Sequence, residues 1–264
     1  MIPILFKLGS FNIYSYGFFV ALAIGAGAVL SILKVRKSDI KITFEQAVDL
    51  FFYTVLSAIV GSRLLFVLVN FHAYRQEPIQ VFKIWEGGLI FYGGLILAVW
   101  VSIWYMKRHR LPIWKVADLV SPPIALGLFF GRIGCFLAGC CYGKETSISC
   151  GVVFTDSNSL ARLNVPLHPT QLYDAANGLA IFFILSWIER KKSFNGEIFW
   201  LFLLLYSVGR FFVEMFRGDP RGFVFGEILS TSQGIGILLA MTSLFMLFYL
   251  KKSSDTPSPS RPPP

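Results

Sequence analysis

The sequence predicts an all-α, polytopic membrane protein with about seven transmembrane helices. Of its 264 residues, 55% are apolar, 16% aromatic and only 15% charged, whereas a soluble domain carries roughly 25% charged residues. The apolar residues form long runs, and short clusters of basic residues separate these runs. So few charges cannot cover a water-soluble surface, which excludes a cytosolic globular enzyme. The clustering of the basic residues indicates membrane topology and not nucleic-acid binding, although the net charge is +9.

Seven segments are long and apolar enough for a membrane span, which needs about 20 mostly apolar residues. The first is not expected to be a cleaved signal peptide, because its apolar run is too long and basic residues follow it. Together the segments make residues 1–252 a single membrane domain. In chain order they are Tyr14–Leu33, Ala47–Val69, Leu89–Met106, Val116–Leu137, Gln171–Trp187, Glu197–Phe216 and Leu229–Leu250.

The connecting loops predict the orientation of these helices. The loops after the first, third, fifth and seventh segments carry twice as many Lys and Arg residues as the opposite set. Because basic loops of membrane proteins face the cytoplasm, the amino terminus is predicted to lie outside and the carboxyl terminus inside. Residues 253–264 are rich in Ser and Pro and are predicted to form a disordered cytoplasmic tail.

Three arginines, Arg63, Arg132 and Arg210, lie inside the predicted spans. A charge near the bilayer centre costs at least about 2.5–3.5 kcal/mol, so each must face a partner or a wet cavity. All three are predicted towards the outer ends of their helices, at a similar depth. Snorkelling to the interface is the alternative interpretation, and Arg63 fits it best.

The sixth segment places Tyr206, Arg210 and Glu214 at successive intervals of four residues, on one face of a helix. An ion pair between Arg210 and Glu214 would lower the cost of burying either charge. Gly209 beside them would let another helix approach closely. A structural clamp and a functional site explain this spacing equally well.

The end of the fourth segment is rich in glycine and contains Arg132. Gly131, Gly134 and Gly143 would let the backbone approach a phosphate, and a guanidinium can bind two of its oxygens at once. The stretch is not a P-loop, because Ala138 stands where the first glycine is required.

His168 lies in the external loop before the fifth segment. A neutral imidazole could act as a base there, although a lone His before Pro more often caps a helix end.

Four cysteines, Cys135, Cys140, Cys141 and Cys150, lie near the outer face, where a disulfide is permitted. Their spacing matches neither C-x-x-C nor a zinc motif. The sequence therefore predicts no metal site and no cofactor.

These motifs together resemble the prolipoprotein diacylglyceryl transferase family over nearly the whole chain. Cys135, Ala138 and Cys140 replace two Asn and one Glu of the family signature, and Tyr92 replaces a His. The resemblance rests on Tyr16-Gly17, Gly61–Leu64, Trp85–Gly88, Tyr92–Ile96, the segment from Gly131 to Gly143, His168–Tyr173, the set Tyr206, Arg210 and Glu214, and Ser230–Gln233.

The resemblance implies that the diacylglyceryl group of phosphatidylglycerol passes to the lipobox cysteine thiol of a prolipoprotein, and that glycerol phosphate is released. This is the first step of bacterial lipoprotein maturation. The implied partners are phosphatidylglycerol, prolipoprotein signal peptides and membrane lipid, with no nucleic acid. The implied location is the bacterial inner membrane, with a periplasmic amino terminus and an active site towards the periplasmic leaflet.

Site residues are expected from the same resemblance. Arg132 and Arg210 are assigned to the phosphate, Glu214 to orienting Arg210, and His168 and Tyr92 to accepting a proton. The catalytic set is therefore Arg210, Glu214, His168 and Tyr92, and the phosphatidylglycerol-binding set is Arg132, Arg63, Gly131, Gly134, Gly143, Tyr16, Tyr206 and Gln233. The alternatives are a membrane thiol oxidoreductase that uses the four cysteines and an anion transporter guided by the arginines.

Overall fold

The computed structural model describes residues 2–8, 11–40, 42–218, 223–224 and 229–255 of the chain. The chain forms two compact units. One unit comprises residues 1–31 and 117–264, and the other comprises residues 32–116.

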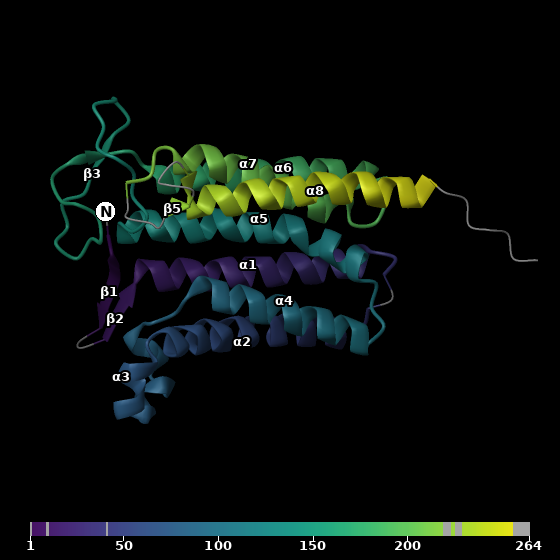
Figure 1. Cartoon of the computed structure of the whole chain (residues 1–264), viewed down its shortest axis with the longest axis horizontal. Helices are drawn as coiled ribbons and strands as arrows, with labels where there is room; N and C mark the ends of the chain where they lie inside the picture. The colour runs from purple at the N-terminus through teal and green to yellow at the C-terminus, as the bar shows by residue number, and fades with distance from the viewer. Residues whose placement is uncertain (1, 9–10, 41, 219–222, 225–228, 256–264) are drawn as a thin grey trace, which may run out of the picture. The chain divides into compact units, whose positions relative to one another are not determined.

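Helices account for most of the described chain (Figure 1). The α-helices are α1 (Ser15–Lys37), α2 (Phe44–Val69), α3 (Phe71–Gln76), α4 (Phe91–Arg108), α5 (Ile113–Ala138), α6 (Thr170–Ile188), α7 (Glu197–Glu214) and α8 (Thr231–Asp255). Short 3-10 helices are η1 (Pro78–Phe82), η2 (Ile84–Glu86) and η3 (Glu189–Lys191). Three antiparallel strand pairs complete the described elements: β1 (Ile4–Leu8) with β2 (Phe11–Tyr14), β3 (Val152–Val153) with β4 (Pro166–Leu167), and β5 (Phe223–Val224) with β6 (Leu229–Ser230).

Each of the seven predicted segments corresponds to a long helix, and the chain is a helical membrane protein. By length and composition, α1, α2, α5, α6 with η3, and α8 could each cross a membrane. Helix α4 is only 18 residues long and ends in Lys107 and Arg108, and α7 contains three charged residues, which lowers the apolar character of both. Helix α8 continues to Asp255, so residues 253–255 of the predicted tail are helical. The remainder of that tail lies outside the described residues.

The first unit packs α7 against α6 and α8 (Figure 1). A buried apolar cluster joins α5, α6 and α7 and is formed by Ala125, Ile181, Leu185, Ile198 and Phe202. At one end of α7, the buried Asp118 carboxylate accepts hydrogen bonds from the N–H groups of Gly196 (2.7 Å) and Phe199 (3.0 Å). Since the first N–H groups of a helix have no partner within the helix, Asp118 of α5 fixes where α7 begins.

The second unit is built on the pair α2 and α4, which lie side by side. Gly61 of α2 faces Gly93 of α4, and a Cβ on either glycine would collide with the backbone of the other. Gly94 is equally crowded by Ala58 and Ser62. Small residues therefore let these two helices approach closely, as is common for helices in membranes.

The turn after α5 is held in place by the segments around it. Lys144 N–H donates to the Phe216 carbonyl (2.8 Å), and His168 N–H donates to the Lys144 carbonyl (2.9 Å). Beyond it, Phe154, Ala161 and Leu167 form a small buried cluster. The chain that leaves α5 is thus tied to the start of α6 and the end of α7, where the charged residues gather.

Candidate active site

Asp174 is the centre of an ionic cluster in the first unit. Its buried carboxylate, on the second turn of α6, lies 3.1 Å from the Arg132 guanidinium of α5 and 3.2 Å from the Arg210 guanidinium of α7. Arg217, which follows α7, lies 3.7 Å from the same oxygen. Three guanidinium groups, one from α5 and two from α7 and the residues directly after it, thus surround one carboxylate.

Glu214 is the second carboxylate of this cluster. It forms the predicted ion pair with Arg210, one helical turn away, and its carboxylate lies 3.8 Å from Nε of Arg217. It also accepts a hydrogen bond from the Ser230 hydroxyl (3.1 Å). Ser230 and Gln233 bond to each other reciprocally at the start of α8, at 3.1 and 3.2 Å. Gln233 therefore acts here as part of the helix cap that places Ser230 against Glu214.

The three guanidinium groups differ in accessibility. The Arg132 side chain is 19% exposed, whereas those of Arg210 and Arg217 are 9% and 2% exposed. The three cations exceed the two carboxylates, Asp174 and Glu214, by one positive charge. A cluster of this kind can bind an anion, and Arg132 is the residue that an incoming anion reaches most easily. The low dielectric of a buried site strengthens this interaction.

The three predicted glycines, Gly131, Gly134 and Gly143, lie in two different kinds of backbone. Gly131 and Gly134 lie within α5, so their amides belong to a helix and not to a loop. A Cβ on Gly134 would be too close to Phe19, which shows that this glycine allows α1 to approach, beside Tyr16. Gly143 donates its N–H to the His168 carbonyl (3.0 Å), and a Cβ there would collide with His168. Gly143 is therefore needed for close packing of the turn.

His168 lies directly before α6 and is partly buried. Its Nδ1 is 3.3 Å from the Tyr173 hydroxyl, and its ring packs against Phe216 with centroids 5.2 Å apart. Two neighbours on α6 hold the turn after α5: the Thr170 hydroxyl donates to the Cys141 carbonyl, and the Gln171 side-chain amide donates to the Cys140 carbonyl, both at 2.8 Å.

Tyr206 lies one turn before Arg210 on α7, and its ring stacks on Phe202 with centroids 6.2 Å apart. Gly209 on the same helix faces Asn177 of α6 and leaves no space for a Cβ. The predicted close approach of another helix at Gly209 is therefore confirmed.

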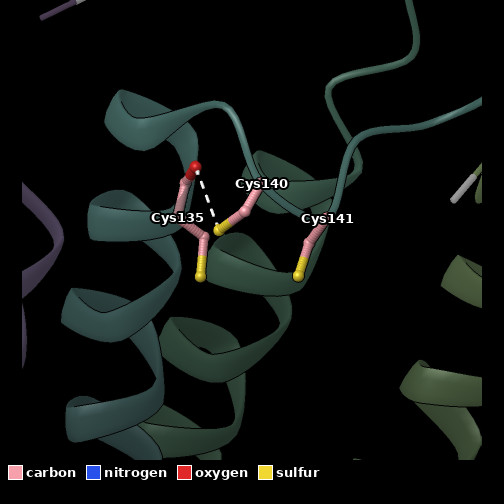
Figure 2. Close-up of side chains that lie close together, drawn as sticks. All are labelled: Cys135, Cys140 and Cys141. Carbon is pink, nitrogen blue, oxygen red and sulfur yellow. Dashed lines mark hydrogen bonds between the residues drawn. The ribbon is translucent and has the colours of Figure 1, made fainter. Parts of the chain in front are cut away.

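Three of the cysteines gather at the end of α5, and all four are free thiols. The sulfur atoms of Cys135, Cys140 and Cys141 lie within 4.8 Å of one another (Figure 2). Hydrogen bonds with the Cys135 and Cys140 thiols, together with the positive charge of Arg217, hold the pKa of Cys141 below its usual range. Cys150 is exposed and is not one of this group.

Arg63 and Tyr92 belong to the second unit. The Arg63 guanidinium is buried and donates to five backbone carbonyls, those of Gln80, Val81, Lys83, Gly87 and Gly88, at 2.6 to 3.3 Å. It therefore orders the segment between α3 and α4. Tyr92 is 46% exposed, on the first turn of α4.

The sequence is similar to known proteins over nearly its whole length. The model of the prolipoprotein diacylglyceryl transferase family matches residues 3–249. The chain belongs to this family. It is 38% identical over 246 residues to the phosphatidylglycerol–prolipoprotein diacylglyceryl transferase of Clostridium tetani. The aligned region covers 93% of this chain and 96% of the relative. The second enzyme of that name in Clostridium perfringens is 36% identical, with 92% and 93% covered, and the Vibrio atlanticus enzyme is 32% identical, with 95% and 91% covered.

Within this family member, two cluster residues have no role in the sequence analysis. Asp174 is an acidic residue inside the fifth predicted span, and a carboxylate in a membrane helix is by itself a signal of function. Arg217 lies three residues after Glu214 and seven after Arg210, so it continues the same helix face by one turn. Attention to the acidic residue in the span, and to the face just beyond the helix end, would have found both.

Proposed function

We propose that the chain transfers the sn-1,2-diacylglyceryl group of phosphatidylglycerol to the lipobox cysteine thiol of a prolipoprotein and releases glycerol phosphate. The relatives carry the name of this activity. The observation in the structure that supports it best is the set of three guanidinium groups around Asp174, with one positive charge in excess. No finding favours a thiol oxidoreductase or an anion transporter.

The reaction forms a bond between the cysteine sulfur and a glycerol carbon, and it breaks the bond from that carbon to a phosphate oxygen. The electron pair of the broken bond stays on the phosphate, whose negative charge therefore grows as the reaction proceeds. Fixed positive charge that meets this growing charge stabilises the transition state more than the substrate. An arginine cluster beside the lipid headgroup is suited to this task.

The arginines have different parts in this proposal. Arg132 is the most exposed of the three and contacts the phosphate first. Arg210 is the second phosphate ligand, and Glu214 and Asp174 fix its guanidinium. Arg217 is nearly inaccessible and acts by positioning Asp174 and Glu214. Arg63 is proposed, from the sequence alone, as a weaker cation for the phosphate. Its guanidinium already donates to five backbone carbonyls.

The proton of the incoming thiol must leave, because the thiolate is the nucleophile. The positive charge of the cluster favours the thiolate. His168 and Tyr92 are the proposed proton acceptors, and the partly buried imidazole of His168 is bonded to Tyr173 at the edge of the turn that Gly143 closes. The tyrosines of the predicted binding set would contact the lipid headgroup, with Tyr16 beside Gly134 and Tyr206 one turn from Arg210. Gly134 and Gly143 would contribute by letting the surrounding chain pack closely.

The proposed location is the bacterial inner membrane, with the arginine cluster towards the periplasmic leaflet. The relatives are bacterial enzymes, and within the first unit the basic residues Arg190 and Lys191 follow α6, at the end of that helix opposite to Asp174.

A reconstituted reaction tests this function. Purified protein is incubated with phosphatidylglycerol vesicles and a synthetic lipobox peptide, and mass spectrometry follows the peptide. We expect one added diacylglyceryl group on the peptide, and none on a matched peptide in which Ser replaces the lipobox Cys. If the protein is folded and neither the lipobox peptide nor the Ser-substituted peptide is modified, the proposal is contradicted.

A further inference from the structure

The three thiols at the end of α5 form an arrangement that the transfer reaction does not require, because its nucleophile arrives on the substrate. Cys135 lies on the last turn of α5, and Cys140 and Cys141 lie in the turn that follows (Figure 2). Gly139 has a φ of +79° and Cys141 a φ of +61°. These left-handed conformations reverse the chain and bring Cys140 and Cys141 back to Cys135. A non-glycine residue such as Cys141 adopts this conformation at a cost, and such strain is often found where a ligand is held.

The surroundings hold the turn in this conformation. Thr170 and Gln171, both fully buried, donate side-chain hydrogen bonds to the carbonyls of Cys141 and Cys140. The Cys140 thiol is 3.7 Å from the Cys135 carbonyl. The backbone is therefore fixed from α6, with the three sulfur atoms within 4.8 Å of one another.

The distances suit coordination of a metal ion. The three sulfurs lie within 4.8 Å of one another, and three sulfurs at about 2.3 Å from a central ion in one plane stand about 4 Å apart. Small side-chain rotations would bring the sulfur atoms from their present separation to the separation that a bound ion requires. Among the described residues, the group contains no His, Asp or Glu as a fourth ligand. Structural zinc sites almost always have four protein ligands, whereas thiolates alone suit soft Cu(I).

The nearby charges favour the same conclusion. Three thiolates around a monovalent ion leave two negative charges in excess. Arg132 interacts electrostatically with Cys135, and Arg217 does so with Cys141. These two cations, which also pair with Asp174, offset part of this negative charge.

We propose that Cys135, Cys140 and Cys141 bind one Cu(I) ion through three sulfur atoms. The linear spacing of the cysteines does not reveal such a site, because the left-handed turn at Gly139 creates it. The proposal concerns the thiols alone and does not depend on the transferase activity.

A competition titration tests it. Full-length protein is purified in detergent, reduced under anaerobic conditions and titrated with Cu(I) in the presence of a chromophoric Cu(I) chelator. We expect one Cu(I) per chain for the wild type and for Cys150→Ser, which changes the exposed cysteine outside the group. Cys135→Ser and Cys140→Ser should each weaken binding by more than about 100-fold, since losing even a second-shell partner costs roughly 10–100-fold.

Alkylation of the wild-type protein gives a test that needs no variant. Without metal, the half-buried Cys140 and Cys141 and the exposed Cys150 should react with iodoacetamide, and with one equivalent of Cu(I) only Cys150 should react. X-ray absorption of the loaded protein should show three sulfur neighbours. The proposal is overturned if Cu(I) protects neither Cys140 nor Cys141, if Cys150→Ser loses as much binding as Cys140→Ser, or if only Zn²⁺ is retained.

Discussion

Replacing Asp174 by Asn tests whether this carboxylate holds the arginine cluster together. The change keeps the shape of the side chain and removes its charge. Arg210 and Arg217 would then keep Glu214 as their carboxylate partner. Arg132 would lose the carboxylate that it contacts at 3.1 Å. Because the Asp174 side chain is only 4% exposed, water cannot replace it as a partner.

The size of the effect follows from the contacts. A pair of opposite charges at the distance between Arg210 and Asp174, 3.2 Å, has a Coulomb energy of about 5 kcal/mol at an effective dielectric constant near 20. Desolvation offsets part of this energy, and removing one partner of a buried ion pair costs about 3–5 kcal/mol in measured cases. For a chain of this size, that loss lowers the melting temperature by roughly 6–20 °C.

The assay is thermal unfolding of the purified variants in detergent. Asp156→Asn is the matched control, because Asp156 lies in a surface turn and an Asn there can still accept the hydrogen bonds from Asn158. We expect the melting temperature of Asp174→Asn to lie well below that of the wild type. The melting temperature of the control should equal that of the wild type. Inorganic phosphate should raise the melting temperature of Asp174→Asn more than that of the wild type, since an added anion replaces the lost charge. Equal stability of Asp174→Asn and the wild type would refute the reasoning.

Three further changes test other parts of the structure. Arg63→Met should expose the segment between α3 and α4 to proteases, because five carbonyls lose their donor; an unchanged digestion pattern would contradict this role. Gly143→Ala should lower the melting temperature, since a Cβ there collides with His168, and Gly131→Ala, which has open space beside it, serves as the control. Ser230→Ala removes the hydroxyl that bonds Glu214 and should reduce the transfer rate by roughly 5–10-fold, as expected for one hydrogen bond of about 1–1.5 kcal/mol; a wild-type rate would show that this bond has no effect.

The helices were predictable from the sequence. The contacts between their side chains were predictable only in part. The seven apolar runs match seven helices of the described chain, five of which are long and apolar enough to cross a membrane. The pair of Arg210 and Glu214 was predictable because four-residue spacing puts both on one helix face. The strand pairs β1–β2, β3–β4 and β5–β6 were not predicted, since each is too short to give a clear pattern.

The centre of the cluster could not be derived from spacing, because its contacts join different helices. Asp174 and Arg132 are distant in the sequence and meet only through the packing of α5 against α6. In the same way, the group of three thiols depends on the left-handed turn at Gly139 and Cys141. Linear motifs miss both sites for the same reason: the chain that connects their members reverses its direction.

The central claim is that the Arg132 guanidinium binds the phosphate of the lipid during transfer. Its most direct test is the rate of diacylglyceryl transfer to a lipobox peptide by Arg132→Ala and Arg132→Lys, with Arg162→Ala as the control because Arg162 forms an exposed surface pair with Glu145. We expect Arg132→Ala to lose about 100–1,000-fold in rate, as for the loss of one donor to a developing anion. Arg132→Lys should recover part of it, because an ammonium group cannot bind two oxygens in a planar fork. A folded Arg132→Ala protein that transfers at the rate of the control would contradict the account.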